Sequence, residues 1–478
     1  MSFPYKKVDK DDMIYFEAVV GKDRVYAGDA IREEYTHDEM PELGTYVPEA
    51  VLEVLSEEEI SKIMKYCWNQ NIPVTPRGAG TGLSGGAVAK YGGIILSLAK
   101  MNRILEWDLD NMVVVCEPGV LLMELAAAAV EKGFLYPPDP GEKTASIGGN
   151  VLCNAGGMRA VRYGTTRDYV RAIEGILPNG DPVKFSSNVV KNTSGYDLKD
   201  LIIGSEGTLC VATKFTLKLL PLPKYSYSLV VPFPTLEACI ETVPKILTSH
   251  LNPTAVEFIQ RDVIGAAETY LGKSFPDKTS DSYLILMFDG NSRSEVESDC
   301  DEAAGICLDA GAMDVFLCNT DERKAAVWNV RGACLEAIKC STTQSEECDV
   351  VVPRSRIAEF VKYAKLVSAR YGIRITTLGH AGDGNIHVQI CRDNLEQKDW
   401  EEGLNNVLHD LYNKSKEFGG QVSGEHGIGH TKIKALRESV GEVTYGLFKA
   451  VKYAFDEKNI LNPGKVVDFN PTGDNVMP

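Results

Sequence analysis

A glycine-rich segment, RGAGTGLSGG at residues 77–86, most constrains how this chain can fold. Through Gly80, Gly82 and Gly85 it contains the pattern GxGxxG, which is typical of Rossmann folds when a helix begins at the loop. Here only residues 87–90 lie between the loop and the start of the next predicted strand, about one helical turn. We therefore predict a loop whose backbone N–H groups cradle a phosphate directly, with a flexible surface loop as the alternative.

Two further segments share this character. PPDPGEKTASIGGNVLCNAGG occupies residues 137–157, and IGSEGTL occupies residues 203–209. Glycine allows a ligand to approach the backbone closely, and Ser146, Asn150 and Asn154 carry polar groups that bind phosphate or ring heteroatoms. Three such segments can surround one large, polar, phosphate-bearing cofactor.

Size and charge exclude several classes of protein. With 478 residues the chain predicts two or three domains, and a net charge of −17 argues against nucleic acid or an acidic membrane as a partner. We find neither a signal peptide nor the ~20 consecutive apolar residues of a membrane span. The twelve cysteines form no CxxC pair, which favours reduced thiols in the cytoplasm over disulfides or an iron–sulfur cluster.

Local patterns predict a mixture of helices and strands. Residues 51–70 predict an amphipathic helix opened by a capping box of Ser56 and Glu59. Residues 170–185 predict a β-hairpin that turns at Asn179-Gly180. Prolines near residues 220–234 suggest a domain boundary. The C-terminal pattern from residue 445 predicts a helix stopped by Asn462-Pro463-Gly464.

Histidines concentrate in two short stretches, GHAGDGNIH at residues 379–387 and SGEHGIGH at residues 423–430. Two imidazoles and the carboxylate of Glu425 suit a divalent metal with an open position for a substrate oxygen. Because neighbouring residues of an extended loop point in opposite directions, Glu425 can ligate while the next residue faces elsewhere. The other interpretation is ordinary buried histidines bonded to backbone. Four of the seven histidines lie in these stretches: His380, His387, His426 and His430.

The order of four motifs resembles one flavoprotein family. PRGAGTGLSGG, DPGEKTASIGGNVLCNAGG, IGSEGTL and NILNPGK follow one another as in FAD-binding proteins of the vanillyl-alcohol-oxidase type, in the branch of glycolate oxidase, D-lactate dehydrogenase and D-2-hydroxyglutarate dehydrogenase. The resemblance implies an α+β fold, with an FAD-binding domain of two α+β subdomains and an α+β substrate cap domain. The implied division is an N-terminal extension (1–44), the FAD-binding domain (45–222), the cap (223–415) and a C-terminal segment that returns to the FAD domain (416–478).

The same resemblance assigns roles to individual residues. FAD is expected to be bound non-covalently, because the first loop has Leu83 and Ser84 and lacks the histidine to which some relatives attach it. His380, His387 and Glu425 match the ligands of a divalent metal (Zn, Fe or Mn). His426 matches the catalytic base, and Arg331 in WNVRGACLEA matches the arginine that binds the substrate carboxylate. His430 matches no role, and we expect it to be structural or to support the site. The residues expected to contact FAD are Pro76, Arg77, Gly78, Ala79, Gly80, Thr81, Gly82, Leu83, Gly85, Gly86, Pro140, Gly141, Ser146, Ile147, Gly148, Gly149, Asn150, Asn154, Gly156, Gly157, Gly164, Glu206, Gly207 and Asn462.

The implied activity is oxidation of a 2-hydroxy acid by hydride transfer to the flavin. Glu346, Glu347 and Asp349 in SEECDVVVP would repel a second carboxylate, which favours D-lactate, oxidised to pyruvate, over D-2-hydroxyglutarate; glycolate is the other candidate. The chain is also similar to the lactate dehydrogenase subunit of anaerobic bacterial complexes with electron-transfer flavoprotein, which couple the reaction by flavin-based bifurcation or confurcation. Three alternatives stay open: a metal-dependent hydrolase, a non-catalytic FAD-binding subunit and an oxygen-linked oxidase.

Overall fold

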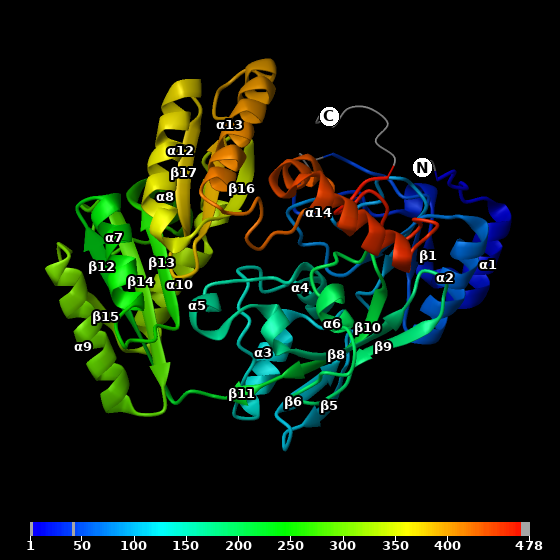
Figure 1. Cartoon of the computed structure of the whole chain (residues 1–478), viewed down its shortest axis with the longest axis horizontal. Coiled ribbons are helices and arrows are strands. Elements are labelled where there is room, and N and C mark those ends of the chain that lie inside the picture. The colour runs from blue at the N-terminus through cyan, green and yellow to red at the C-terminus, as the bar shows by residue number, and fades with distance from the viewer. Residues whose placement is uncertain (1–2, 41–43, 470–478) are drawn as a thin grey trace. The chain divides into compact units, whose positions relative to one another are not determined.

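The structure is a computed structural model that describes residues 3–40 and 44–469 (Figure 1). The chain forms two compact units, and each contains segments that are distant in sequence. Unit 1 comprises Met1–Ala155, Thr165–Pro221 and His426–Pro478, and unit 2 comprises Gly156–Gly164 and Leu222–Glu425.

Unit 1 contains two larger sheets. In the first, of order β1-β2-β4-β3, the neighbours β2, β4 and β3 run parallel. The second, of order β5-β6-β10-β8-β9, is antiparallel throughout. The strands are β1 (Val25–Tyr26), β2 (Ala50–Glu53), β3 (Val74–Arg77), β4 (Ile94–Ser97), β5 (Ile104–Asp108), β6 (Val113–Cys116), β8 (Val170–Ile176), β9 (Pro182–Ser186) and β10 (Val211–Lys218), with β7 (Phe134–Leu135) paired to β11 (Leu220–Pro221).

The predicted β-hairpin turn at Asn179-Gly180 and the helix N-cap at Ser56 are confirmed, but the capping box is not. β8 and β9 form the expected antiparallel hairpin. Helix α2 (Glu57–Gln70) begins after Ser56, whose side chain accepts a hydrogen bond from the Glu59 N–H. The capping box itself does not close, because the Glu59 carboxylate accepts the Leu55 N–H and pairs with Arg24. The remaining helices of unit 1 are α1 (Lys10–Val20), α3 (Leu122–Glu131), α4 (Ile147–Cys153), α6 (Leu198–Ile202) and α14 (Ile433–Phe455).

The first glycine-rich segment connects two parallel strands without a helix. β3 ends at Arg77, β4 begins at Ile94, and residues 78–93 form bends and turns. This confirms that the GxGxxG pattern does not open a Rossmann helix. The backbone amides of this loop are therefore not used by a helix, although those of Ala79 and Gly85 donate to Ser146 and Asp38.

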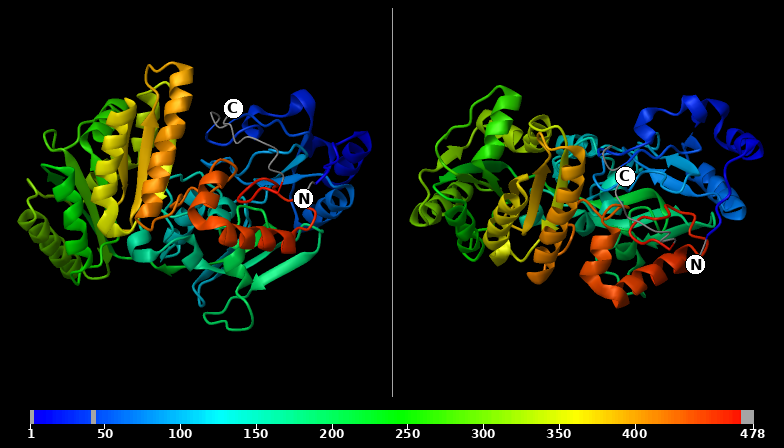
Figure 2. Two further views of the ribbon diagram at one scale, coloured as in Figure 1. Left: turned by 45° about the horizontal axis from the view of Figure 1, so that its top comes forward. Right: turned by 90° about the horizontal axis from the view of Figure 1, so that it is seen from above.

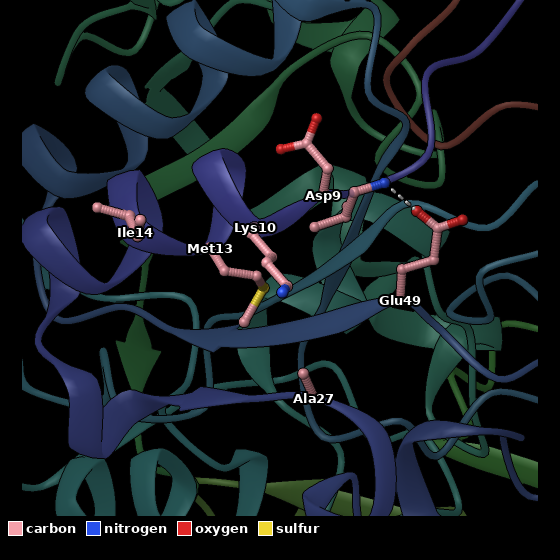
Figure 3. A pocket seen from close by; sticks show the side chains of 7 residues that line it. Asp9, Lys10, Met13, Ile14, Ala27 and Glu49 are labelled. Atoms are coloured by element: carbon pink, nitrogen blue, oxygen red, sulfur yellow. Dashed lines mark hydrogen bonds between the residues drawn. The ribbon is translucent and has the colours of Figure 1, made fainter.

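The N-terminal residues pack as part of unit 1. Phe16 and Val20 of α1 are buried with Ile60 and Ile63 of α2 in one hydrophobic cluster. The Val8 N–H donates to the Glu49 carboxylate, which closes one side of a pocket beside α1 (Figure 3). The pocket is lined by Val8, Asp9, Lys10, Met13, Ile14, Ala27 and Glu49. It contains none of the residues expected to bind FAD, metal or substrate.

Helix α14, orange-red in Figure 2, is held in unit 1 by its buried Lys452, which also pairs with Asp456 at the end of the same helix. Lys452 donates to the Asp456 carboxylate at 2.6 Å, to the Leu461 carbonyl at 2.7 Å and to the Thr208 carbonyl at 2.8 Å. All three ammonium protons are thereby satisfied. The helix ends at Phe455, before the expected stop at Asn462, because the Asp456 carboxylate accepts the N–H groups of the residues that would otherwise continue the helix.

Unit 2 is built on one antiparallel sheet of order β15-β12-β14-β13-β17-β18-β16. Side chains alternate between its two faces. One face packs in a cluster with α7, α9, α12 and α13, and the other with α8, α10 and α11. The strands are β12 (Tyr225–Phe233), β13 (Ala255–Gln260), β14 (Ser282–Gly290), β15 (Phe316–Cys318), β16 (Ser345–Val351), β17 (Arg374–His380) and β18 (Asn385–Cys391).

The helices of unit 2 are α5 (Ala160–Tyr163), α7 (Leu236–Leu247), α8 (Arg261–Leu271), α9 (Arg293–Asp309), α10 (Asp321–Gly332), α11 (Cys334–Cys340), α12 (Ile357–Tyr371) and α13 (Gln397–Glu417). With 21 residues, α13 is the longest unbroken helix that the structure describes, since α14 is interrupted at Gly441, whose φ of 79° is not helical. No described helix combines the length and apolarity needed to cross a membrane.

We expect Lys452→Met to lower the free energy of unfolding by about 3–5 kcal/mol, because it leaves the buried Asp456 charge uncompensated. The double variant Lys452→Met/Asp456→Asn should recover part of this loss. Urea unfolding measures both. Lys62→Met is the control, since it breaks an exposed i,i+4 pair with Glu58 and should change the free energy by about 0.5 kcal/mol or less. Equal decreases in the free energy of unfolding for Lys452→Met and Lys62→Met would contradict a stabilising role of the buried pair.

Candidate active site

Two of the predicted metal ligands lie on adjacent strands. His380 is the last residue of β17 and His387 is the third residue of β18, so the expected glycine-containing turn is the connection of a β-hairpin. In β18, Ile386 and Val388 pack in the cluster that contains α12 and α13. Alternation therefore turns His387 toward the opposite face of the sheet, the face that also carries His380.

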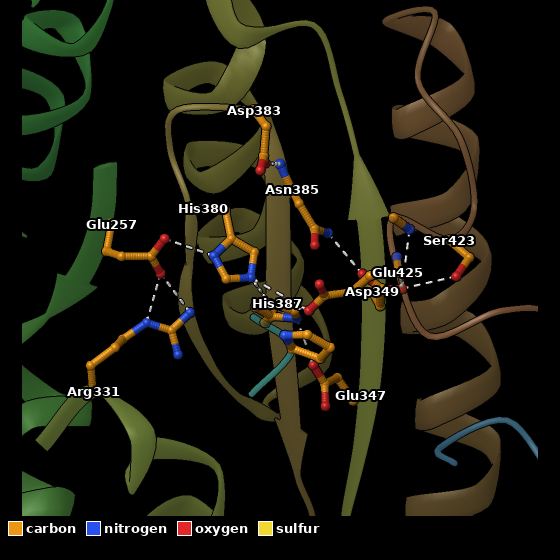
Figure 4. A network of polar contacts seen from close by, with 12 residues as sticks. Glu257, Arg331, Glu347, Asp349, His380, Asp383, Asn385, His387, Ser423 and Glu425 are labelled. Carbon is orange, nitrogen blue, oxygen red and sulfur yellow. Dashed lines mark hydrogen bonds and ion pairs between the residues drawn. The ribbon is translucent and has the colours of Figure 1, made fainter. Parts of the chain in front are cut away.

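Three ligand atoms converge at this face (Figure 4). The Nε2 atoms of His380 and His387 lie 3.3 Å apart, and Oε1 of Glu425 lies 3.4 Å from each of them. Both imidazoles are buried, and the Glu425 side chain is only 14% exposed. The structure thus brings together, within unit 2, the three residues that the sequence predicted as metal ligands.

A buried aspartate holds the loop that carries Glu425. Asp349 is fully buried, and its Oδ2 accepts hydrogen bonds from Ser423 Oγ at 2.9 Å and from the N–H groups of Gly424 and Glu425 at 3.0 Å. Its other oxygen accepts from Asn385 Nδ2 at 2.7 Å. The acids of SEECDVVVP therefore do not form one negative patch, because Asp349 is occupied by donors and Glu346 belongs to the opposite face of β16.

Each imidazole has a second carboxylate at its far nitrogen. Nδ1 of His380 lies 2.7 Å from Oε1 of Glu257, and Nδ1 of His387 lies 2.8 Å from Oε1 of Glu347. Although burial by itself lowers the pKa of both imidazoles, the nearby carboxylates outweigh it and raise the pKa of each. Both rings are thus set in a strongly acidic environment that favours cationic groups.

Arg331, the predicted ligand of the substrate carboxylate, lies near the end of α10 and packs against Glu257. Its Nε and Nη2 donate to Oε2 of Glu257 at 2.8 and 2.7 Å. The arginine side chain is 11% exposed and the glutamate is completely buried. Arg331 is therefore a buried group held in a two-point ion pair, not the surface helix residue that its sequence context also allowed.

The predicted base, His426, begins the third segment of unit 1, directly after Glu425. It is partly exposed, and its carbonyl accepts a hydrogen bond from Ser84 Oγ at 3.1 Å. The loop that follows is held by Glu206, whose carboxylate accepts the N–H groups of Ile428 and Gly429, each at 2.7 Å. Glu206 was expected to contact FAD; in the structure both of its carboxylate oxygens hold this loop.

His430 was expected to be structural or to support the site. It is buried, and burial together with Lys465 and Lys90 lowers its pKa to about 3, so the imidazole is neutral. Its ring contacts Tyr46 edge-on, and its N–H donates to the Ser84 carbonyl. A Cβ on the preceding Gly429 would lie 1.7 Å from that carbonyl oxygen, so this close approach requires glycine. His430 thus fastens its loop to the first glycine-rich segment.

The three glycine-rich segments meet within unit 1. Ser146 Oγ accepts the Ala79 N–H at 3.2 Å, which joins the first and second segments; a Cβ on Gly78 would lie 2.1 Å from this oxygen. Asn462 Nδ2 donates to the carbonyls of Gly86 at 3.0 Å and Glu206 at 2.8 Å, which joins the first and third segments. Three segments that are distant in sequence are therefore linked to one another by hydrogen bonds and form one polar surface.

Several polar atoms of this surface are buried without a hydrogen-bond partner among the described residues. They are Asn150 Nδ2, Ser205 Oγ and Asn462 Oδ1. A buried polar atom without a partner costs about 1–3 kcal/mol, so such atoms are expected where a polar ligand completes the site. Donors and acceptors of this kind beside glycine backbone fit a dinucleotide such as FAD.

Four of the residues expected to contact FAD differ from the others in the unit to which they belong or in the partners of their side chain. Gly156, Gly157 and Gly164 belong to the short segment Gly156–Gly164, which groups with unit 2. The Arg77 guanidinium is directed to the carbonyls of Glu34, His37 and Ala87, so that only its backbone is available to a ligand. The other expected FAD residues lie in unit 1.

Sequence analysis missed Glu257 altogether and interpreted Glu347 only as a repulsive charge. Glu257 is the one acid of the buried strand AVEFIQ, and Glu347 is one of three acids in SEECDVV, whose residues are also largely buried. A carboxylate at such a position requires a charged or hydrogen-bonding partner. That rule marks both residues as members of a buried polar cluster, although it does not identify their partners.

Comparison with known proteins agrees with this architecture. The model of the family "FAD linked oxidases, C-terminal domain" matches residues 222–466, and the model "FAD binding domain" matches residues 48–186. The expected FAD-binding capacity is thus confirmed. The first match covers more than half of the chain and contains every predicted metal and substrate residue.

Relatives extend over nearly the whole chain. A D-lactate dehydrogenase of Anaerostipes hadrus is 47% identical, over 97% of this chain and 98% of that protein. The glycolate oxidase subunit GlcD of Bacillus subtilis is 35% identical, over 96% and 97%. A D-lactate dehydrogenase of Archaeoglobus fulgidus is 38% identical, over 91% and 96%.

Solved structures of lower identity share the fold. p-Cresol methylhydroxylase with substrate bound superposes with a TM-score of 0.80 at 18% identity, covering 99% of this chain and all of that chain. The 4-ethylphenol oxidase of Gulosibacter chungangensis, in complex with isoeugenol, gives 0.78 at 18% identity, covering 97% and 98%. The predicted α+β fold of the vanillyl-alcohol-oxidase type is confirmed, and the chain belongs to the family of FAD-linked oxidases that includes D-lactate dehydrogenases and glycolate oxidase subunits.

Proposed function

We propose that this protein is an FAD-dependent dehydrogenase that oxidises D-lactate to pyruvate with the help of a divalent metal. The observation that carries the proposal is the convergence of His380 Nε2, His387 Nε2 and Glu425 Oε1 within 3.4 Å of one another. The substrate is supported by the name of the relative that is 47% identical over almost the full length of both chains.

The spacing of these three atoms fits a metal ion. Zinc bonds to imidazole nitrogen at about 2.0–2.1 Å, so two ligand atoms at tetrahedral corners are about 3.3–3.4 Å apart. The measured separations of 3.3 and 3.4 Å match this value. Three protein ligands leave one position open, as is usual in catalytic sites. Iron and manganese also accept two histidines and a carboxylate.

In the proposed reaction, each group of the substrate has a residue to receive it. The Arg331 guanidinium binds the carboxylate, for which its planar fork is suited. Neutral His426 takes the proton of the C2 hydroxyl. When bound, the metal acidifies that hydroxyl and FAD accepts the C2 hydride. Oxidation of D-lactate thus releases one proton to the protein and two electrons, as hydride, to the cofactor.

The charges of the site favour a substrate with a single carboxylate. Glu257 already neutralises Arg331, and Glu347 and Glu425 add two negative charges beside the imidazoles. A second carboxylate on the substrate would therefore be repelled by these acids. Glycolate shares the single carboxylate and is the alternative substrate.

The electrons are proposed to leave through a partner protein, an electron-transfer flavoprotein. This part of the proposal rests on the resemblance described above and on no contact within this chain. Its consequence is that the isolated protein, although reduced by substrate, passes electrons to NAD only through the partner. We further propose that the protein acts in the cytoplasm.

Under anaerobic conditions, D-lactate should bleach the flavin absorption of the purified protein. Chelation of the metal should abolish bleaching, and addition of Zn²⁺, Fe²⁺ or Mn²⁺ should restore it, because the hydroxyl is acidified only by the bound metal. Visible spectroscopy before and after addition of substrate measures this. A clearly higher kcat/KM with glycolate or D-2-hydroxyglutarate than with D-lactate would reject the proposed substrate.

His387→Ala should lower kcat/KM for D-lactate by at least about 100-fold, since a catalytic metal supplies several kcal/mol of stabilisation. The flavin content should stay unchanged, because the FAD-binding loops lie in unit 1. His409→Ala is the matched control, as His409 is an exposed histidine on α13 and should retain full activity. Bound metal is quantified in both variants. Full activity of His387→Ala without bound metal would exclude the metal-assisted mechanism.

Native purification tests the partner. We expect the protein to co-purify with electron-transfer flavoprotein subunits, and NAD reduction by D-lactate to require them. Gel filtration followed by mass spectrometry identifies the partner, and an assay with the separated protein serves as the control. Rapid NAD reduction by the chain alone would show that no such partner is needed.

A further inference from the structure

Glu257 occupies a central position in the buried polar cluster. Its side chain has no solvent exposure, and each carboxylate oxygen has a different partner (Figure 4). Oε1 lies 2.7 Å from Nδ1 of His380, and Oε2 accepts Nε and Nη2 of Arg331 at 2.8 and 2.7 Å. One carboxylate therefore contacts both the proposed metal ligand and the proposed substrate arginine.

The sheet and one helix determine this arrangement. β13 and β17 run antiparallel, and Glu257 lies directly opposite His380 in the register. Side chains directly opposite one another in an antiparallel pair have Cβ atoms about 4.5–5.5 Å apart. Arg331 reaches the same point from α10, which covers this face of the sheet. Glu257 thus contacts two residues that lie 74 and 123 positions further along the chain.

For His380, the contact determines which nitrogen is available to a metal. When Nδ1 carries the hydrogen and donates it to Glu257, Nε2 keeps its lone pair. Nε2 is the atom that lies 3.3 Å from His387 Nε2 and 3.4 Å from Glu425 Oε1. Glu347 lies at the corresponding nitrogen of His387, with 2.8 Å between Oε1 and Nδ1, although this ion-pair contact does not have hydrogen-bond geometry. Each carboxylate therefore contacts the far nitrogen of one proposed metal ligand.

For Arg331, the contact fixes the plane of the guanidinium. Glu257 takes the edge formed by Nε and Nη2, so the hydrogens of Nη1 are left for another acceptor. Nη1 makes no hydrogen bond to the part of the chain that the structure describes. Among the described residues, Arg331 makes no hydrogen bond or ion pair with Glu347. The two carboxylates therefore differ in one respect, which is that only Glu257 also orients the substrate arginine.

We infer that Glu257 is a positioning residue that couples metal binding to recognition of the substrate carboxylate. The inference rests on the proposed function, because it assigns the metal to His380 and the carboxylate to Arg331. Glu347, by contrast, contacts the proposed metal ligand His387 and not Arg331. Loss of the Glu257 charge thus disturbs both a metal ligand and the substrate arginine, whereas loss of the Glu347 charge leaves the ion pair of Arg331 in place.

The test compares Glu257→Gln with Glu347→Gln, two acid-to-amide changes of the same size at equivalent imidazoles. Affinity for Zn²⁺ is measured on the FAD-loaded protein by competition with a chromophoric chelator. Both variants should bind Zn²⁺ about 10–100-fold more weakly, the usual cost of losing a partner of a metal-bound histidine. Affinity for pyruvate is then measured at saturating Zn²⁺ from the change in the flavin spectrum. Glu257→Gln should weaken pyruvate binding at least tenfold, and Glu347→Gln should leave it unchanged.

Several outcomes would overturn the inference. If both variants bind pyruvate with equal affinity, Glu257 affects only metal binding. If Glu257→Gln binds Zn²⁺ with unchanged affinity, Glu257 has no role at the metal site. If Glu257→Gln does not fold with FAD, Glu257→Asp replaces it, since the shorter acid keeps the charge but cannot reach both partners; wild-type affinities for both ligands would then reject the coupling. Failure of the proposed function appears instead in the wild-type protein, as absence of Zn²⁺ binding or of D-lactate oxidation.

Discussion

The antiparallel pairing of β13, β17, β18 and β16 is the constraint on which the candidate site depends. These four strands are neighbours in one sheet, and alternate residues of each face the same side. That side presents Glu257, His380, His387 and Glu347 at adjacent positions, while the other side packs the apolar residues between them. A shift of one residue in any of these registers would exchange the polar and apolar sets. The hydrophobic core of unit 2 therefore also specifies the geometry of its polar cluster.

In unit 1, the expected ligand-binding surface is made of loops and not of strands. Loops have no ladder of hydrogen bonds to fix them, and here side chains of distant segments do so instead. Ser146, Glu206 and Asn462 each bond to the backbone of another segment. These contacts hold the glycine-rich backbone in place without covering it with side chains. The polar cluster of unit 2 is thus positioned by strand register, whereas the loops of unit 1 are positioned by hydrogen bonds between distant segments.

Much of this could be predicted from the sequence, for reasons that differ between elements. The hairpin at Asn179-Gly180 and the cap at Ser56 depend on neighbouring residues, and both were found. The absence of a Rossmann helix followed from counting the residues between two strands. Grouping His380, His387 and Glu425 required only that histidines be rare elsewhere in the chain, although their assignment as ligands still depends on the proposed function.

What could not be predicted depends on contacts between distant residues. The burial of Lys452 on α14 depends on a hydrogen bond to the Thr208 carbonyl, 244 positions earlier in the chain, which no local pattern reveals. Glu257 sits within a strand whose neighbours are known only from the sheet order. Arg77 lies in the first glycine motif, yet its side chain bonds to carbonyls of residues 34–37 and 87. In each case the partner is chosen by the tertiary fold.

The boundary between the units has one consequence for how this protein can vary. Glu425 is the last residue of unit 2, and His426 is the first residue of the final segment of unit 1. A single peptide bond keeps their Cα atoms about 3.8 Å apart. Connections between compact units usually tolerate insertions and deletions. Here one added residue would separate the loop held by Asp349 from the loop held by Glu206. We therefore expect this junction to have an invariant length, unlike the other crossings between the units.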